Sequence, residues 1–189
     1  MKKIVVESYN PKWVHGFHEL KEAYLTHIRP DLKIEHIGGT SIPGAFARPI
    51  LDIDIVVQTE GEAKTLIGAL GELGYIYEDD HHIKGMWFFR RSLQDVPLMY
   101  EHHSKWLSHH LFVCLENSLA HRYHMAIKSY LMNHEEAIEE YNALKLALSH
   151  KYPHDKDKYL HEKTPFIARI LSVCEFTSEE IEEISKSMV

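Results

Sequence analysis

The sequence has little cysteine and no long apolar run. Only two cysteines, Cys114 and Cys174, occur among 189 residues, and they form no Cys-x-x-Cys pair. We therefore expect no disulfide framework but two reduced thiols, small buried apolar side chains of a cytoplasmic protein. No stretch approaches the roughly 18 apolar residues of a membrane span, so no membrane partner is expected.

Net positive charge is also absent. The 28 acidic residues outnumber the 21 lysines and arginines, which gives a formal charge of −7 with neutral histidines. This balance argues against broad attraction to a nucleic-acid backbone, so an anionic ligand must be held by a local cluster of cations. The 16 histidines are numerous, and their full protonation below about pH 6.5 would change the formal charge from −7 to +9.

Hydrophobic periodicity divides the chain into a mixed first part and a helical second part. Apolar side chains recur every three or four residues from Trp13 to Ile28, and a capping box at Thr59 precedes a second helical stripe. Strands are predicted for Leu32–Ile37, Ile50–Val57, Tyr75–Tyr77, Met86–Arg91, Pro97–His102 and His109–Leu115. We therefore expect one α+β domain, in which a mixed β-sheet core (1–116) is followed by a helical part (117–189) packed on it.

Two acids, Asp52 and Asp54, interrupt the most apolar predicted strand. Because side chains alternate along a strand, both carboxylates lie on one face and Ile53 and Ile55 on the other. Buried carboxylates are unfavourable without a cation beside them. The pattern predicts a metal site, and Mg²⁺ suits carboxylate and phosphate oxygens. The alternative is a pair of acids that forms salt bridges with Arg48 or with lysines.

A turn rich in glycine and hydroxyl groups comes before the acidic strand. Gly38, Gly39, Thr40 and Ser41 offer backbone N–H groups and two hydroxyls, which suit an anion such as phosphate. Glycine and hydroxyl residues also serve ordinary tight turns, so that alternative stays open. A metal site beside a phosphate cradle suggests nucleotide chemistry.

These motifs resemble a known family. The segments His36–Gly44 (HIGGTSIPG) and Arg48–Asp54 (RPILDID) are similar to the signature of the GrpB-like family, and the resemblance extends over nearly the whole chain. It implies a nucleotidyltransferase-like core with the DNA-polymerase-β-like fold, in which paired acids bind divalent metal and a third carboxylate follows on a neighbouring strand. Three positions depart from the family pattern: Gly39 replaces a common Ser, Phe112 replaces a common His, and Pro165 falls where a helix usually continues.

The resemblance and the order of the chain suggest further site residues. Glu101 is the candidate third carboxylate, with Asp95 and Glu116 as alternatives, and His110 is the residue that would replace it as a catalytic group. Arg48 and Arg90 are candidate phosphate clamps, because arginine suits bidentate contact with phosphate. Lys145 and Lys163 resemble conserved basic positions of the family. For all four cations the alternative is an ordinary solvated surface. A zinc site at His109 and His110 is a weaker alternative, since no other ligand follows at a defined spacing.

We therefore expect a Mg²⁺-dependent nucleotidyltransferase-like protein that acts on a nucleoside triphosphate and an unspecified acceptor. Asp52 and Asp54 would hold the metal, and the turn and basic residues would hold the phosphates. The alternative is a non-catalytic module on the same fold that binds a nucleotide or a coenzyme A precursor. A histidine-based metallohydrolase is a third possibility.

Overall fold

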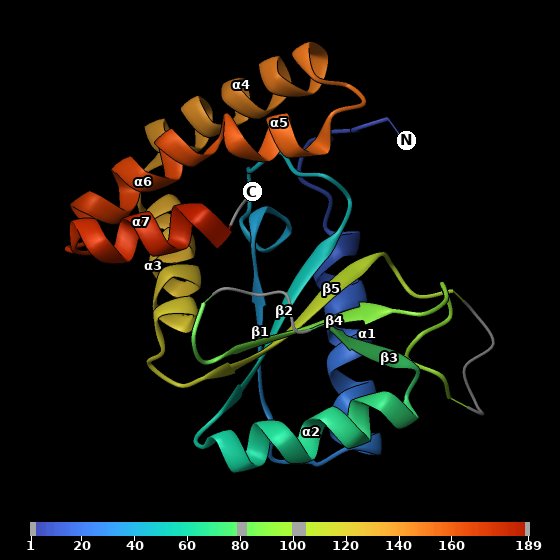
Figure 1. Ribbon diagram of the computed structural model, residues 1–189. Coiled ribbons are helices and arrows are strands. Elements are labelled where there is room, and N and C mark those ends of the chain that lie inside the picture. The colour runs from blue at the N-terminus through green and yellow to red at the C-terminus, as the bar shows by residue number, and fades with distance from the viewer. Residues whose placement is uncertain (1–2, 79–82, 100–104, 188–189) are drawn as a thin grey trace.

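The computed structural model describes residues 3–78, 83–99 and 105–187, with a five-stranded mixed sheet at the centre (Figure 1). The strand order is β1-β2-β5-β4-β3, and only β2 and β5 run parallel. The strands are β1 (Lys33–Ile37), β2 (Leu51–Val57), β3 (Tyr75–Glu78), β4 (Met86–Arg91) and β5 (His109–Leu115). The predicted α+β class and mixed sheet are confirmed.

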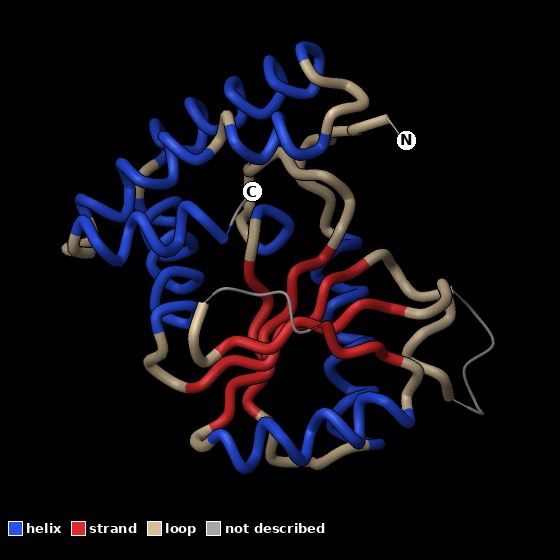
Figure 2. Tube along the Cα trace, viewed as in Figure 1, coloured by secondary structure: helices blue, strands red, loops and turns tan. Residues whose placement is uncertain are grey.

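Helices cover both faces of the sheet (Figures 1 and 2). Two of them, α1 (Lys12–His27) and α2 (Glu60–Glu72), pack on one face, where they share a core with the apolar side chains of β2 and β5. The remaining helices lie over the opposite face. They are α3 (Leu119–Asn133), α4 (Glu135–Lys151), α5 (Lys156–His161), α6 (Thr164–Val173) and α7 (Ser178–Ser187).

Because side chains alternate along β2, its two faces carry different residue types. Ile53 and Ile55 are fully buried in the core beneath α1 and α2. Asp52 and Asp54 are paired in register with His110 and Phe112 of β5, so these four side chains share the opposite face. The acidic face of the sheet is therefore turned toward the helical part of the chain.

Most predicted elements are present, with one clear exception. Pro97, Leu98 and Met99 form no strand, so the predicted strand Pro97–His102 is wrong over the described part, while residues 100–102 lie outside the described residues. Proline has no N–H to give to a sheet, and the amide of Leu98 donates instead to the carbonyl of Leu73 at 2.8 Å. The candidate third acid, Glu101, also lies outside the described residues.

The helical part is interrupted before Pro165. Helix α5 ends at His161, and α6 begins at Thr164 with Pro165 in its first turn, where proline needs no hydrogen-bond donor. The departure of this chain from the family pattern at Pro165 thus corresponds to a real break, and Lys163 lies in it. Among the described helices, none is long and apolar enough to cross a membrane.

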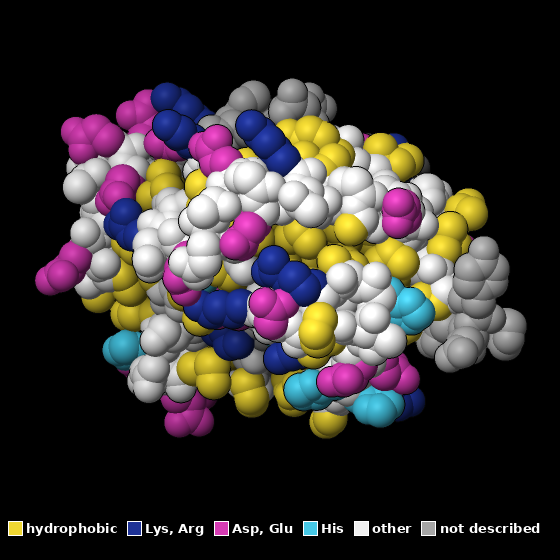
Figure 3. Space-filling model, turned by 90° about the horizontal axis from the view of Figure 1, so that it is seen from below, with side chains coloured by type: hydrophobic (Ala, Val, Ile, Leu, Met, Phe, Trp, Pro, Cys, Tyr) yellow, Lys and Arg dark blue, Asp and Glu magenta, His cyan; other side chains and the backbone are white. Residues whose placement is uncertain are grey.

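Acidic and basic side chains are interspersed on the face shown in Figure 3. The described side chains there form no continuous basic tract, as expected for a chain with a formal charge of −7.

Candidate functional site

Asp52 meets a histidine from the neighbouring strand. The parallel pairing of β2 and β5 sets Asp52 opposite His110, and His110 Nδ1 lies 2.8 Å from Asp52 Oδ1. The Asp52 side chain is 31% exposed. Burial favours the neutral acid, but the hydrogen bond from His110 and the nearby charges of His110, Arg48 and His124 outweigh it and lower the pKa of Asp52. Asp52 therefore presents a carboxylate to the space above the sheet.

Asp54 has a different environment. Its side chain is fully buried, and Oδ2 accepts a 2.8 Å hydrogen bond from Nδ1 of His124, a residue of α3. Its other oxygen, Oδ1, is buried with no hydrogen-bond partner among the described residues. On the edge of β2 away from β5, the neighbouring strand β1 places Glu35 opposite Asp54. The Glu35 carboxylate lies 3.3 Å from His121 and 3.5 Å from Lys33.

The turn Gly38–Ser41 lies directly against Asp52. Gly38 has φ +67°, and a Cβ atom there would lie 2.3 Å from Asp52 Oδ2, so only glycine fits. The hydroxyls are turned inward: Ser41 Oγ donates to the carbonyl of Gly38 at 2.8 Å, and Thr40 Oγ1 lies 3.0 Å from His36 Nε2. A short 3₁₀ helix begins at Gly39, and the first amides of a helix have no partner within it. The amide of Ser41 already donates to the carbonyl of Gly38 at 3.1 Å, so the cradle predicted for Gly38 to Ser41 is reduced to the amides that precede Ser41.

Three cations surround a small cavity in front of this turn. Arg48, Lys145 and Lys163 line a volume of about 130 Å³ together with Gly38, Gly39 and Asp52. Lys145 is only 3% exposed, and its Nζ donates to the carbonyl of Phe46. Burial, with the charge of Lys163, lowers the pKa of Lys145 to about 7. Burial, with the charge of Arg48, lowers the pKa of Lys163 to about 8, although Asp52 opposes this. Among the described residues that line the cavity, Asp52 is the only acid beside these three basic side chains.

A second cavity of about 280 Å³ adjoins the first. Asp52, His110 and Lys163 line it together with apolar side chains such as Met86, Phe112 and Ile127. A polar cavity and an apolar-walled cleft thus meet at Asp52. Binding sites for small molecules often combine apolar walls with a few polar groups.

Some predicted site residues do not join this group. Arg90 forms an ion pair with Glu78 at 2.5 Å and lines a third hollow, which His110 also lines but Asp52 does not. His109 is turned to the other face, where its Nε2 lies 2.5 Å from the hydroxyl of Tyr75. The two adjacent histidines, His109 and His110, therefore do not form a joint metal site.

The described residues supply no carboxylate on β5 beside the paired acids. His110 and Phe112 occupy the positions opposite Asp52 and Asp54. Glu116 lies past the end of the strand, where it binds Lys33 at 2.8 Å, and Asp95 lies in an exposed loop. Glu101 stays a prediction, since it lies outside the described residues.

His124 is a residue near the paired acids that sequence reasoning missed. The predicted stripe of α3 ran through Leu119, Tyr123 and Ala126, whereas the fully buried positions Ala120 and Leu131 define a stripe shifted toward His124. A search for titratable residues in every helical phase would have found it.

Comparison with known proteins decides the family. The family model described as GrpB protein matches residues 3–173. The chain belongs to the GrpB family. A UPF0157 protein of Pseudomonas aeruginosa is 31% identical over 170 residues, and the glutamate-rich protein GrpB of Alkalihalophilus pseudofirmus is 27% identical over 179 residues. The crystal structure of conserved protein GrpB from Enterococcus faecalis is similar with a TM-score of 0.73 at 26% identity, and covers 95% of this chain and 99% of that chain.

The GrpB relatives differ in length. The matched region covers 89% of this chain but 66% of the Pseudomonas aeruginosa protein, and 88% of this chain but 46% of the UPF0157 protein YqkA of Bacillus subtilis. It covers 90% of this chain and 95% of the Alkalihalophilus pseudofirmus protein. The names of these relatives state no reaction, so an activity for this GrpB-family chain is a proposal.

Proposed function

We propose that this GrpB-family chain binds a nucleoside triphosphate with Mg²⁺ and transfers its nucleotidyl group to an acceptor. The observation that carries the proposal is the meeting of Arg48, Lys145 and Lys163 with the Gly38 turn and Asp52 around one cavity of about 130 Å³. Phosphate oxygens satisfy such a set of cations and backbone amides. The apolar-walled cleft beside it gives room for the rest of the ligand. The resemblance to nucleotidyltransferases in turn and paired acids supports the same chemistry.

The donor set around Asp52 fits Mg²⁺. Mg²⁺ prefers octahedral oxygen ligands and is commonly held by one or two carboxylates, substrate phosphates and water. Asp52 faces both cavities as a carboxylate, so it would hold the ion, which would neutralise phosphate charge during transfer. Asp54 lines neither cavity, and its carboxylate would join the ion only after His124 releases it. Within this proposal His110 holds Asp52 in place, and Arg48, Lys145 and Lys163 orient the phosphates.

The test is calorimetric titration of the purified protein with a nucleoside triphosphate, with and without Mg²⁺. Asp52→Asn should remove the Mg²⁺ dependence, and Lys163→Met should weaken binding by at least about tenfold, because a charge-assisted hydrogen bond is lost. The matched controls are Asp31→Asn and Lys158→Met, whose side chains are 73% and 66% exposed. Absence of binding in the wild type, or equal losses in the controls, would refute the proposal.

A second candidate function is binding without transfer. It is favoured by His110 and Phe112, which occupy the β5 positions beside the paired acids, where a further carboxylate would complete a two-metal site. In that case Mg²⁺-dependent binding persists while no pyrophosphate is released in the presence of any acceptor. Pyrophosphate release that disappears in Asp52→Asn separates the enzyme from the binding module.

A further inference from the structure

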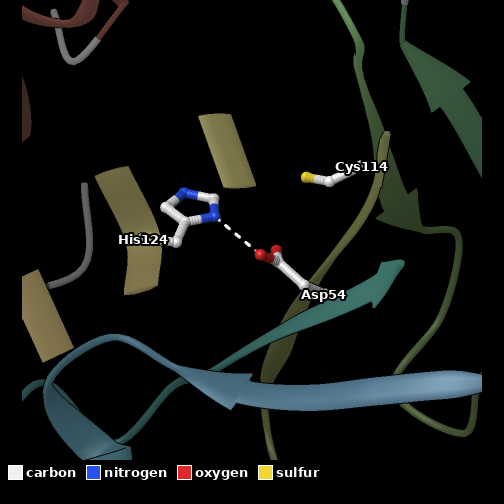
Figure 4. Close-up of side chains that lie close together, drawn as sticks. All are labelled: Asp54, Cys114 and His124. Atoms are coloured by element: carbon white, nitrogen blue, oxygen red, sulfur yellow. Dashed lines mark hydrogen bonds and ion pairs between the residues drawn. The ribbon is translucent and has the colours of Figure 1, made fainter. Parts of the chain in front are cut away.

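Behind the proposed nucleotide site, three side chains of different chemistry meet in the buried space between the sheet and α3. Asp54 comes from β2, Cys114 from β5 and His124 from α3, and one ligand atom from each lies within 4.8 Å of the other two (Figure 4). The Asp54 and Cys114 side chains are fully buried, and that of His124 is 8% exposed. Segments far apart in the chain thus converge on one point.

One atom of this group lacks the partner that burial demands. Asp54 Oδ2 is held by His124 Nδ1 at 2.8 Å, but Oδ1 is buried with no hydrogen-bond partner among the described residues. A buried carboxylate oxygen without a partner is costly, and native proteins rarely leave one in that state. Burial raises the pKa of the Cys114 thiol most, and the negative charge of Asp54 and the contact of the thiol with the Asp54 carboxylate raise it further, so Cys114 stays protonated beside the acid. A divalent cation reverses that preference, because a coordinating thiol gives up its proton.

The three ligand types select the kind of ion. Mg²⁺ and Ca²⁺ take oxygen ligands, whereas thiolate with imidazole favours Zn²⁺ and similar transition metals. One thiolate and one carboxylate also balance the charge of a divalent ion at this buried position. The other ring nitrogen, His124 Nε2, lies 2.8 Å from the hydroxyl of Tyr123, whose oxygen can accept a hydrogen bond from Nε2–H when Nδ1 binds a metal.

We propose that Asp54, Cys114 and His124 form a three-ligand site for a transition-metal ion, Zn²⁺ above all, that ties α3 to the sheet. Binding breaks the hydrogen bond between His124 and Asp54, moves the imidazole proton to Nε2 and releases the Cys114 proton to solvent. The fourth position of a tetrahedral ion is left for water, since His124 also lines the cleft. This site does not include Asp52, the proposed Mg²⁺ ligand, and it needs no nucleotide. While a transition metal holds Asp54, the proposed Mg²⁺ ion would be held by Asp52 without Asp54.

The test uses Co²⁺ as the probe, added to the metal-free, untagged full chain. Surface binding is expected from a chain with 16 histidines, so stoichiometry alone is not decisive, but only Cys114 and Cys174 can give a thiolate-to-cobalt absorption band. Wild type should show this band at one Co²⁺ per chain, and one equivalent of Zn²⁺ should remove it. Cys114→Ser should lack the band, whereas the matched control Cys174→Ser should keep it.

Two further readouts keep the proposal falsifiable if Cys114→Ser folds poorly. His124→Gln should weaken Co²⁺ binding at the band by at least about tenfold, since a ligand is lost. No band in the wild type, or a band lost in Cys174→Ser, overturns the proposal whatever the variants do. Mg²⁺-dependent nucleotide binding should be unchanged in Cys114→Ser, so failure of this metal site and failure of the proposed function are read separately.

Discussion

Lys145 carries an ammonium group at a place that water hardly reaches. Its Nζ lies 3.8 Å from the centre of the Tyr141 ring and donates to the carbonyl of Phe46, and Lys163 lines the same cavity. Burial holds the pKa of Lys145 at about 7, compared with 10.5 for a free lysine. A bound phosphate would raise that pKa, because it supplies the missing negative charge. Burial of the Lys145 ammonium group therefore lowers the stability of the free protein, and a bound anion would offset that cost.

We expect Lys145→Met to stabilise the free protein at pH 6 while it weakens nucleotide binding by at least about tenfold. The unfolded chain binds more protons than the folded one between the two pKa values, about 7 and 10.5, so the cost of Lys145 is full below pH 7 and fades as the pH rises. The pKa difference sets a ceiling of about 5 kcal/mol, and about 1–3 kcal/mol should remain after the hydrogen bond to Phe46 is lost.

Urea denaturation at pH 6 and pH 9 checks this expectation, with Lys158→Met as the exposed control. The gain in unfolding free energy should be larger at pH 6 than at pH 9 for Lys145→Met and near zero at both for the control. A variant that loses stability equally at both values would show that Lys145 is a structural residue without an electrostatic cost.

The sequence determines some site residues and leaves others open for a physical reason. Alternation along one strand was enough to put Asp52 and Asp54 on a common face, because it is a local property. It could not predict the hydrogen bond between Asp54 and His124, because His124 lies 70 positions later on a helix whose rotation is set by packing. The inward hydroxyls of Thr40 and Ser41 were also unpredictable, since their acceptors are chosen by the fold of the turn.

At the scale of elements, β2 and β5 form the parallel pair that builds the site. Parallel strands need a crossover, and here α2, β3 and β4 lie between them in the chain. Strands inside a covered sheet are apolar on both faces, so two acids in such a strand stand out against their surroundings. This is why the sequence pointed to β2 so clearly. The predicted strand Pro97–His102 has no partner strand in its described part, a property that only the sheet order reveals.

A buried chain of hydroxyls links three elements beneath the sheet. The Tyr75 hydroxyl of β3 lies 2.6 Å from that of Tyr24 in α1 and 2.5 Å from Nε2 of His109 in β5. His109 Nδ1 donates to the carbonyl of Leu107 at 2.8 Å, which leaves Nε2 as an acceptor for Tyr75. The hydrogen bonds of this network are complete only when the side chains of Tyr24, Tyr75 and His109 are all present.

We expect Tyr75→Phe to lower the free energy of unfolding by about 1–3 kcal/mol, because it leaves buried polar atoms of Tyr24 and His109 without a partner. Equilibrium urea unfolding measures the loss. Tyr9→Phe is the control, since it removes a hydroxyl at a half-buried position of the N-terminal segment and should change stability by no more than about 0.5 kcal/mol. Equal values for the two variants would mean that the buried chain contributes nothing specific.

At the scale of the whole molecule, the cavity of about 130 Å³ is built from both parts of the chain. Gly38, Arg48 and Asp52 come from the sheet part, and Lys145 and Lys163 come from the helical part. Sequence reasoning found all five separately but could not dock the helices, because docking depends on packing between distant segments. A ligand in this cavity would contact both parts at once, so binding should stabilise their association by mass action.

The response of the molecule to acid follows from two buried histidines. Burial lowers the pKa of His109 to about 3, and burial with the charge of Lys128 lowers that of His36 to about 4. Both are neutral in the folded protein, whereas in the unfolded chain they bind protons below about pH 6.5. The unfolded state therefore binds more protons between pH 6.5 and 4, and stability must fall as the pH falls through this window.

We expect the free energy of unfolding to drop by about 2–3 kcal/mol per pH unit between pH 6 and 4.5, since each histidine contributes about 1.4 kcal/mol per unit. Urea midpoints across this range give the slope. His109→Gln should reduce the slope by about half, whatever its effect on stability at pH 7, because only the proton uptake of His109 is removed. His15→Gln, at a side chain that is 78% exposed, should leave the slope unchanged. If His109→Gln retains the wild-type slope, proton uptake by His109 does not cause the loss of stability in acid. The loss would then come from other histidines, whose protonation changes the formal charge from −7 toward +9.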